Sequence, residues 1–292
     1  MISIASLRPR ALACGEPRGA RERDLTIGPW RIRFEGLDEP LDRILAERWR
    51  GFWTEPRGAA GATVRLVRGD GAPWIPPGPP GERYRLEADA GDGGVLACSY
   101  HFALAQRAPD AWTLALEDAS TEPMGRVAEN AARYLVARLA AESGGAALHG
   151  ASVLKDGRVF VFAGPSRSGK STAVGLSAGA VSLGDDYAVL LRTPDGWVVA
   201  GVPFDNAERA PAPPMPAAPL ALVCRLHQAP QPRLERPSGP AAHAGVMACL
   251  AFPWALPDLS ERLHDAVDAL VASGRFAELW FAPEPSFWKL LG

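Results

Sequence analysis

The chain has 292 residues, of which 47% are apolar and 22% charged, an ordinary composition for a globular protein long enough to form two domains. Its formal net charge of −2 gives no global field that would attract nucleic acid or an anionic membrane, so we expect neither as a partner. The cysteines are scattered, which favours reduced thiols in a cytoplasmic protein over a disulfide framework or a metal cluster: Cys14, Cys98, Cys224 and Cys249.

The N-terminal region predicts a small, β-rich α+β domain, which we place at residues 1–119. Arg8, Pro9 and Arg10 interrupt the first apolar residues, so we expect no signal peptide, and no apolar stretch has membrane-spanning length. Alternation and helical spacing predict a strand at 30–34, a helix at 41–53, strands at 62–67, 83–87, 95–105 and 111–116, and a Pro/Gly-rich loop at 72–81.

A helix at residues 124–142 leads into the second domain, which we place at residues 120–292. Its apolar stripe recurs at helical spacing and Gly144–Gly145 end it: Val127, Ala131, Tyr134, Leu135 and Leu139. The apolar runs 148–154 and 158–163 follow, separated by Lys155, Asp156 and Gly157. Asp-Gly between two apolar runs predicts a tight antiparallel hairpin.

The second strand of this hairpin enters a phosphate-binding P-loop, G-x-x-x-x-G-K-[ST]. The predicted nucleotide-binding residues are Gly164, Pro165, Ser166, Arg167, Ser168, Gly169, Lys170, Ser171 and Thr172. The glycines allow the backbone to turn its N–H groups into one concavity, helped by the positive end of the following helix. Lys170 reaches the outer phosphates of ATP and the Ser171 hydroxyl is a ligand for Mg²⁺.

Two adjacent carboxylates, Asp185 and Asp186, end the next predicted strand, one short helix beyond the loop. Neighbouring side chains on a strand point to opposite faces, so one of them points at the phosphates while the strand stays regular. One carboxylate is suited to hold Mg²⁺ and the other to act as a base toward an acceptor hydroxyl. A plain turn with two solvated acids is the alternative.

The rest of the chain predicts further strands and helices without a motif of its own. In order, the pattern predicts a hairpin around 194–196, a Pro/Ala-rich loop at 210–219, a strand at 220–226, a helix at 258–273, a strand at 277–281 and a helix at 286–291. The aromatic residues Trp280, Phe281, Phe287 and Trp288 favour a core over a base-stacking platform. The Pro/Ala-rich loop is long enough to be a lid, and Arg209 at its start is a candidate phosphate contact.

The order His-Gly, hairpin, P-loop, short helix, Asp-Asp resembles the catalytic domain of HPr kinase/phosphorylase. The pieces are 148–150, 164–171 and 185–186, and the resemblance covers about residues 143–283. It implies a mixed, strongly twisted sheet of α+β or α/β class carrying the P-loop, as in ATP-dependent phosphoenolpyruvate carboxykinase. The wider family includes similar kinases of lasso-peptide gene clusters that act on a serine of the precursor peptide.

By this resemblance, Lys170 binds the β- and γ-phosphates, Asp185 is the catalytic base, Asp186 and Ser171 hold the metal, and His149 lies beside them. The signature that the phosphorylase reaction uses has no clear copy here, and the N-terminal half is unlike that of HPr kinase. The expected function is therefore an ATP- and Mg²⁺-dependent kinase of a hydroxyl, on a serine of a protein or peptide acceptor. A small-molecule kinase and a non-catalytic nucleotide-binding subunit are the alternatives, and a homo-oligomer is compatible with each.

Overall fold

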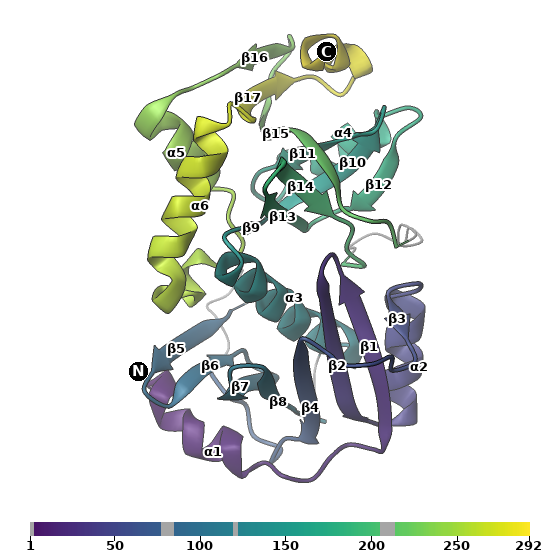
Figure 1. The fold of residues 1–292 in the computed structure, drawn as a ribbon, viewed down its shortest axis with the longest axis vertical. Helices are drawn as coiled ribbons and strands as arrows, with labels where there is room; N and C mark the ends of the chain where they lie inside the picture. Colours follow the sequence, from purple (N-terminus) through teal and green to yellow (C-terminus); the bar gives the residue numbers. More distant parts are fainter. Residues whose placement is uncertain (1–2, 77–84, 119–121, 205–213) are drawn as a thin grey trace. The chain divides into compact units, whose positions relative to one another are not determined.

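The protein has a mixed α+β architecture with two mixed sheets (Figure 1). The computed structural model describes residues 3–76, 85–118, 122–204 and 214–292. The internal contacts divide the chain into one unit of Met1–Leu135 with Trp254–Asp258 and a second of Val136–Pro253 with Leu259–Gly292. The division falls within helix α3 (Met124–Glu142), whose bounds are those that the sequence predicts.

The N-terminal unit contains an 8-stranded sheet in the order β3-β1-β2-β4-β8-β7-β6-β5. β4 is parallel to β2 and β8, and the other neighbours are antiparallel. Its strands are β1 (Arg21–Ile27), β2 (Trp30–Leu37), β3 (Trp53–Thr54), β4 (Ala62–Arg68), β5 (Glu87–Gly91), β6 (Gly94–Cys98), β7 (Phe102–Ala108) and β8 (Ala111–Leu116). Its helices are η1 (Ile4–Leu7), α1 (Arg8–Ala13) and α2 (Glu39–Arg48).

Three predictions for this unit are wrong in their bounds. The strand predicted at 83–87 overlaps only the start of β5 (Glu87–Gly91). The predicted helix 41–53 ends at Arg48, because the chain turns there and Trp53 enters β3, where its ring packs on Phe34 at 5.3 Å between centroids. The predicted strand 95–105 is a hairpin, β6 and β7, closed by a hydrogen bond of 2.9 Å from the N–H of Ser99 to the carbonyl of Phe102.

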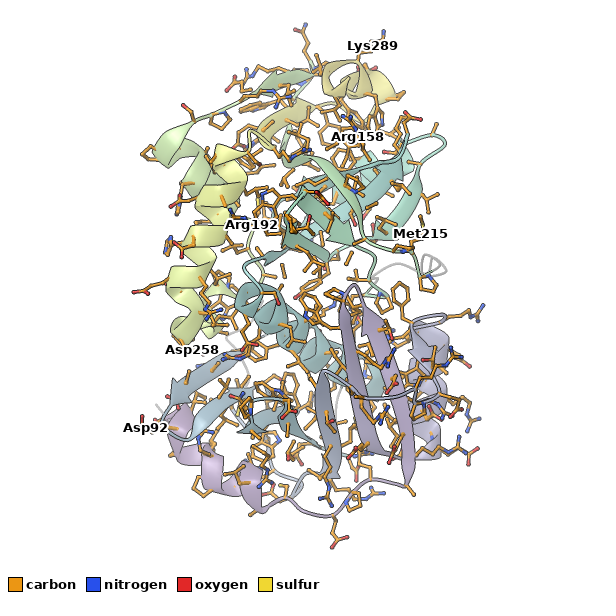
Figure 2. The ribbon with its side chains drawn as sticks, in the orientation of Figure 1. Asp92, Arg158, Arg192, Met215, Asp258 and Lys289 are labelled. Atoms are coloured by element: carbon orange, nitrogen blue, oxygen red, sulfur yellow. The ribbon has the colours of Figure 1, made fainter. Side chains whose placement is uncertain are left out.

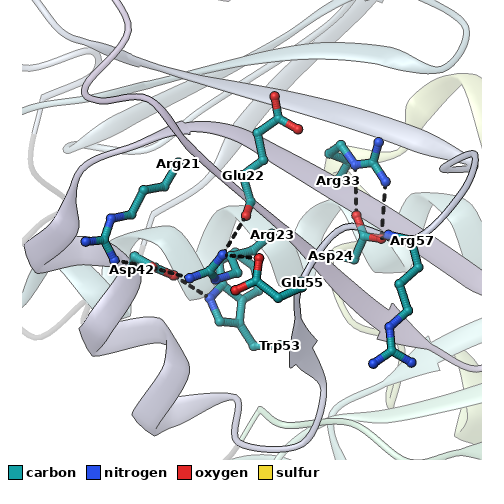
Figure 3. Close-up of polar contacts among 9 residues, drawn as sticks. All are labelled: Arg21, Glu22, Arg23, Asp24, Arg33, Asp42, Trp53, Glu55 and Arg57. Atoms are coloured by element: carbon teal, nitrogen blue, oxygen red, sulfur yellow. Dashed lines mark hydrogen bonds and ion pairs between the residues drawn. The ribbon is translucent and has the colours of Figure 1, made fainter.

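Strand β1 was not predicted, because its charged residues hide the apolar alternation. Figure 3 shows two buried carboxylates that bind arginines. Asp24 of β1 contacts Arg33 of β2, and Asp42 of α2 contacts two arginines of β1. Asp42 accepts hydrogen bonds from Arg21 at 3.1 Å, from Arg23 at 3.0 Å and from the indole of Trp53 at 2.9 Å. These bonds satisfy charged side chains of β1, so a segment with a polar sequence forms a strand.

The second unit contains a 9-stranded sheet whose main path runs β12-β10-β11-β15-β14-β13-β9, with β17 beside β15 and β16 beside β17. β15 is parallel to β11 and β17, and the other pairs are antiparallel. The strands are β9 (Ala146–Leu148), β10 (Gly150–Lys155), β11 (Arg158–Ala163), β12 (Val181–Gly184), β13 (Ala188–Thr193), β14 (Gly196–Ala200), β15 (Ala218–Gln228), β16 (Arg233–Glu235) and β17 (Phe276–Phe281).

The helices that follow α3 in the chain have at most 13 residues. They are α4 (Lys170–Gly175), α5 (Gly239–Met247), η2 (Pro253–Ala255), η3 (Pro257–Leu259), α6 (Ser260–Ala272), η4 (Pro285–Phe287) and α7 (Trp288–Leu291). The hairpin predicted at Asp156 and Gly157 is confirmed as β10–β11, and both residues have the positive φ of a tight hairpin turn, 50° and 76°. Arg158, labelled in Figure 2, opens β11 at the end opposite the glycine-rich loop.

One apolar core lies behind that loop. Phe162 of β11, Cys224 of β15 and Phe281 of β17 pack with Val174 of α4 and Phe287 of η4. The prediction that the C-terminal aromatics form a core is confirmed for Phe281 and Phe287. Trp280 differs, because the side chains of β17 alternate and its ring stacks on His227 of β15 at 4.6 Å between centroids.

Among the residues that the structure describes, no helix is long and apolar enough to cross a membrane.

Candidate functional site

A glycine-rich loop, residues 164–169, joins β11 to α4 and has a strained, tightly packed backbone. Gly164, Arg167 and Gly169 have φ values of 149°, 68° and 102°. A Cβ on Gly164 would lie 2.8 Å from the hydroxyl of Ser168, and one on Gly169 would lie 2.8 Å from the ring of Phe281. Only glycine fits these two positions, which are the two that the motif fixes as glycine.

Lys170 opens α4 and is folded back into the loop. It is only 7% exposed, and its ammonium donates hydrogen bonds to the carbonyls of Gly164 at 2.9 Å and Pro165 at 3.1 Å. Burial lowers the pKa of Lys170, and the carboxylate of Asp186, 3.7 Å away, acts in the opposite direction. A buried cation is thus held where the loop's backbone converges.

The two carboxylates that follow β12 lie in different surroundings. The turn that carries them is packed closely, since a Cβ on Gly184 would lie 2.7 Å from both the carbonyl of Tyr187 and a methyl group of Val202. Asp186 turns toward Lys170, as described above, and Asp185 is 5% exposed. The adjacent pair therefore offers one carboxylate at the lysine and a second in a more enclosed position.

His149 occupies a break between β9 and β10, where the sequence suggests one continuous apolar run. Its N–H donates to the carbonyl of Cys249 at 2.8 Å, and its own carbonyl accepts from the N–H of Gly164 at 3.1 Å. Its Nε2 lies 2.8 Å from Oδ1 of Asp186. The break therefore joins the imidazole, the first glycine of the loop and the carboxylate.

An open groove of about 470 Å³ lies beside the loop and the start of α4. It is mainly apolar in lining: Gly169, Thr172, Gln228, Ala229, Pro230, Phe281, Ala282 and Pro283. The amide of Gln228 donates a hydrogen bond of 2.8 Å to the carbonyl of Arg167 and so ties β15 to the loop. Gln228 was not predicted, because an isolated glutamine at a strand end belongs to no motif.

The predicted metal ligands, Ser171 and Asp186, supply hydroxyl and carboxylate oxygens, the donors that Mg²⁺ prefers. In kinase sites Mg²⁺ is held by few protein ligands, and substrate phosphates and waters complete its shell. The described part of the chain contains no group of three or more His, Cys, Asp or Glu side chains suited to a metal ion. These residues fit Mg²⁺ held jointly with phosphate better than a metal held by protein alone.

The remaining predicted residues have varied positions. Pro165, Ser166, Arg167, Ser171 and Thr172 are exposed, and Ser168 is half-buried. Arg209 lies outside the described residues, as does the first part of the predicted Pro/Ala-rich loop.

The sequence matches no protein-family model. A search of curated proteins finds no match to it either.

Proposed function

We propose that this chain is an ATP- and Mg²⁺-dependent kinase that transfers the γ-phosphate to a hydroxyl, on a serine of a protein or peptide. The observation that carries the proposal is the convergence of a buried lysine, a carboxylate and an imidazole on one glycine-rich loop. Lys170 and His149 lie 3.7 Å and 2.8 Å from the same oxygen of Asp186.

The loop supports phosphate binding through its backbone and its lysine. The positive φ values at Gly164, Arg167 and Gly169 turn the chain sharply, as in loops whose N–H groups surround a phosphate. The Lys170 ammonium is already desolvated, so its attraction for an anionic phosphate is stronger than that of a surface lysine. Triphosphate charge would replace the loop carbonyls as its partner.

The carboxylates support transfer rather than binding alone. When Mg²⁺ is bound with the triphosphate, it neutralises charge on the β- and γ-oxygens, and Asp186 and Ser171 are suited to hold it. The acceptor oxygen forms a bond to the γ-phosphorus as the bond from that phosphorus to the β,γ-bridging oxygen breaks. The acceptor proton passes to the Asp185 carboxylate, and ADP leaves with the electron pair.

The groove beside the loop is suited to the nucleoside part of the cofactor. Its volume of about 470 Å³ lies within the range of small-molecule sites, and its lining is mainly apolar with a single amide side chain, that of Gln228. Phe281 lines it and also meets Gly169, so the groove continues directly from the loop.

The experiment is steady-state formation of ADP from Mg·ATP by the full chain, with and without acceptors. One arm supplies a pool of serine-containing peptides and the other a panel of small alcohols. Stimulation by the peptides supports the proposal, and stimulation by the alcohols alone would make the chain a small-molecule kinase. Nucleotide binding without stimulated turnover in either arm would favour a regulatory subunit.

A further inference from the structure

Arg225 of β15 lies at the same level of the sheet as the start of the glycine-rich loop. β15 is the parallel neighbour of β11, and Arg225 is aligned with Ala163, the residue before Gly164. A Cβ on Gly164 would lie 3.8 Å from the backbone nitrogen of Leu226. Arg225 and Gly164 thus lie near the carboxyl ends of two parallel strands. Ligands bind at this edge in open sheets with parallel strands.

The side chain of Arg225 lies on the face of the sheet opposite the apolar core. Its neighbours Cys224 and Leu226 belong to that core, so alternation directs Arg225 to the other face, together with Glu278 of β17. Its Nη1 lies 3.3 Å from Oε1 of Glu278. The Arg225 side chain is 32% exposed and the Glu278 side chain 11%, so the carboxylate is the more deeply buried partner of a side chain that still reaches the surface.

Glu278 is itself held from the other side. Its second oxygen bonds to Nε2 of His227, and the imidazole stacks on Trp280. A Cβ on Gly245 of α5 would lie 2.8 Å from Oε1 of Glu278, so the helix backbone closes over the carboxylate. A carboxylate fixed in this way restricts the orientation of the guanidinium that it contacts.

Cys249 is buried, and its backbone contacts the site. Its backbone carbonyl accepts from the N–H of His149 at 2.8 Å. Burial raises the pKa of Cys249 to about 12, while the positive charges of Arg225 and Lys170 both act to lower it. The charges of Arg225 and Lys170 therefore both act on the thiol of a residue whose backbone is bonded to His149.

We propose that Arg225 is a second cation of the phosphate site, contacting the terminal phosphate, and that Glu278 is the residue that positions it. The inference rests on the proposed function. A planar guanidinium presents several N–H groups, and Glu278 occupies only one side of it, which leaves donors for two phosphate oxygens. Lys170 then approaches the phosphates from the start of α4, and Arg225 approaches them from β15.

The test is isothermal titration of the full chain with Mg·AMP-PNP and with Mg·ADP. Since hydrogen bonds to charged groups contribute about 1.5–3 kcal/mol, Arg225→Gln is expected to weaken AMP-PNP binding about 10- to 100-fold and ADP binding less than about threefold. The ratio of the Kd for ADP to the Kd for AMP-PNP therefore falls in Arg225→Gln. Glu278→Gln is expected to lower this ratio by a smaller factor. The matched control is Arg158→Gln, an exposed arginine at the opposite end of β11, which should keep the wild-type ratio.

An unchanged ratio in folded Arg225→Gln would overturn the inference while wild-type binding leaves the proposed function standing. If wild type binds neither nucleotide, the proposed function fails and the inference fails with it. Should Arg225→Gln not fold, Arg225→Lys decides, because lysine keeps the charge but lacks the planar fork. Arg225→Lys is expected to lower the ratio of the two Kd values at least about threefold. A ratio equal to that of wild type in this variant overturns the inference.

Discussion

Nε2 of His149 and Oδ1 of Asp186 are 2.8 Å apart, and this contact joins the break between β9 and β10 to the turn after β12. The same oxygen lies 3.7 Å from the ammonium of Lys170. Asp186 is therefore the centre of the candidate site, although Asp185 is the more deeply buried of the two carboxylates. The contact suggests that the imidazole orients the carboxylate that would carry the metal.

The two carboxylates are expected to separate by their kinetics. Loss of a general base typically costs about 10²- to 10⁴-fold in rate, so Asp185→Asn should lower kcat by this factor and leave nucleotide binding nearly unchanged. Asp186→Asn should instead weaken Mg²⁺-dependent nucleotide binding. The measurements are kcat and the Mg²⁺ dependence of binding for both variants. The reverse pattern would exchange the roles, and two fully active variants would reduce the pair to a turn.

His149→Ala should act through Asp186 rather than on nucleotide directly. Residues that orient a metal ligand typically contribute about 10- to 100-fold to metal affinity or activity. The expected result is a rise in the Mg²⁺ concentration that half-saturates turnover, with little change in nucleotide affinity at saturating Mg²⁺. A Mg²⁺ titration equal to that of wild type would remove His149 from the site.

Gly169→Ala is expected to destabilise the second unit and to impair nucleotide binding. The substitution forces a side chain into a left-handed conformation, which costs about 1–3 kcal/mol, and also drives it against Phe281. Gly179→Ala is the matched control, because Gly179 also has a positive φ, of 73°, with nothing within 4 Å of its added Cβ. Both variants should lose stability in thermal unfolding, but only Gly169→Ala should lose binding. Equal binding by both variants would contradict the packing argument.

The buried ammonium of Lys170 is expected to lower the free energy of unfolding of the ligand-free protein. Burial lowers its pKa in the folded state, so between that pKa and its ordinary value of 10.5 the unfolded chain binds more protons, and stability rises with pH. Below this window the buried ammonium is charged and its cost is fully present. Lys170→Met should therefore be at least as stable as wild type at pH 7, with the difference narrowing as the pH rises toward 10.5. A Tm for Lys170→Met several degrees below that of wild type at pH 7 would contradict this.

The sequence predicts the elements that carry the loop because their signals are local. The turn at Asp156 and Gly157, the strand 158–163 and the helix 124–142 each follow from short-range pattern, and the structure confirms them. Strand β1 was missed because its charged residues pair outside the strand. Arg21 and Arg23 bond to Asp42, from a helix later in the chain, and Asp24 bonds to Arg33 of β2. The break at His149 was missed because the bond from its N–H to Cys249 joins residues a hundred positions apart.

The same reason limits what pattern says about the site. Gly164, Gly169 and Lys170 are marked by a motif, whereas Gln228 and Arg225 come from a strand with no motif. Parallel pairing of β15 with β11 brings them to the loop, and sequence periodicity does not specify which strands pair.

The measurement that tests the central claim most directly is isothermal titration of Mg·AMP-PNP into wild type, Lys170→Ala and Lys155→Ala. Lys155 is a control cation at the far end of β10, where its ammonium donates to the carbonyl of Ala178 at 3.2 Å. Wild type and Lys155→Ala should bind one nucleotide per chain in the presence of Mg²⁺. Lys170→Ala should bind at least about tenfold more weakly, because a charge-assisted bond to phosphate is lost. Undetectable binding by wild type, or equal binding by a folded Lys170→Ala variant, would contradict the assignment of the glycine-rich loop to phosphate.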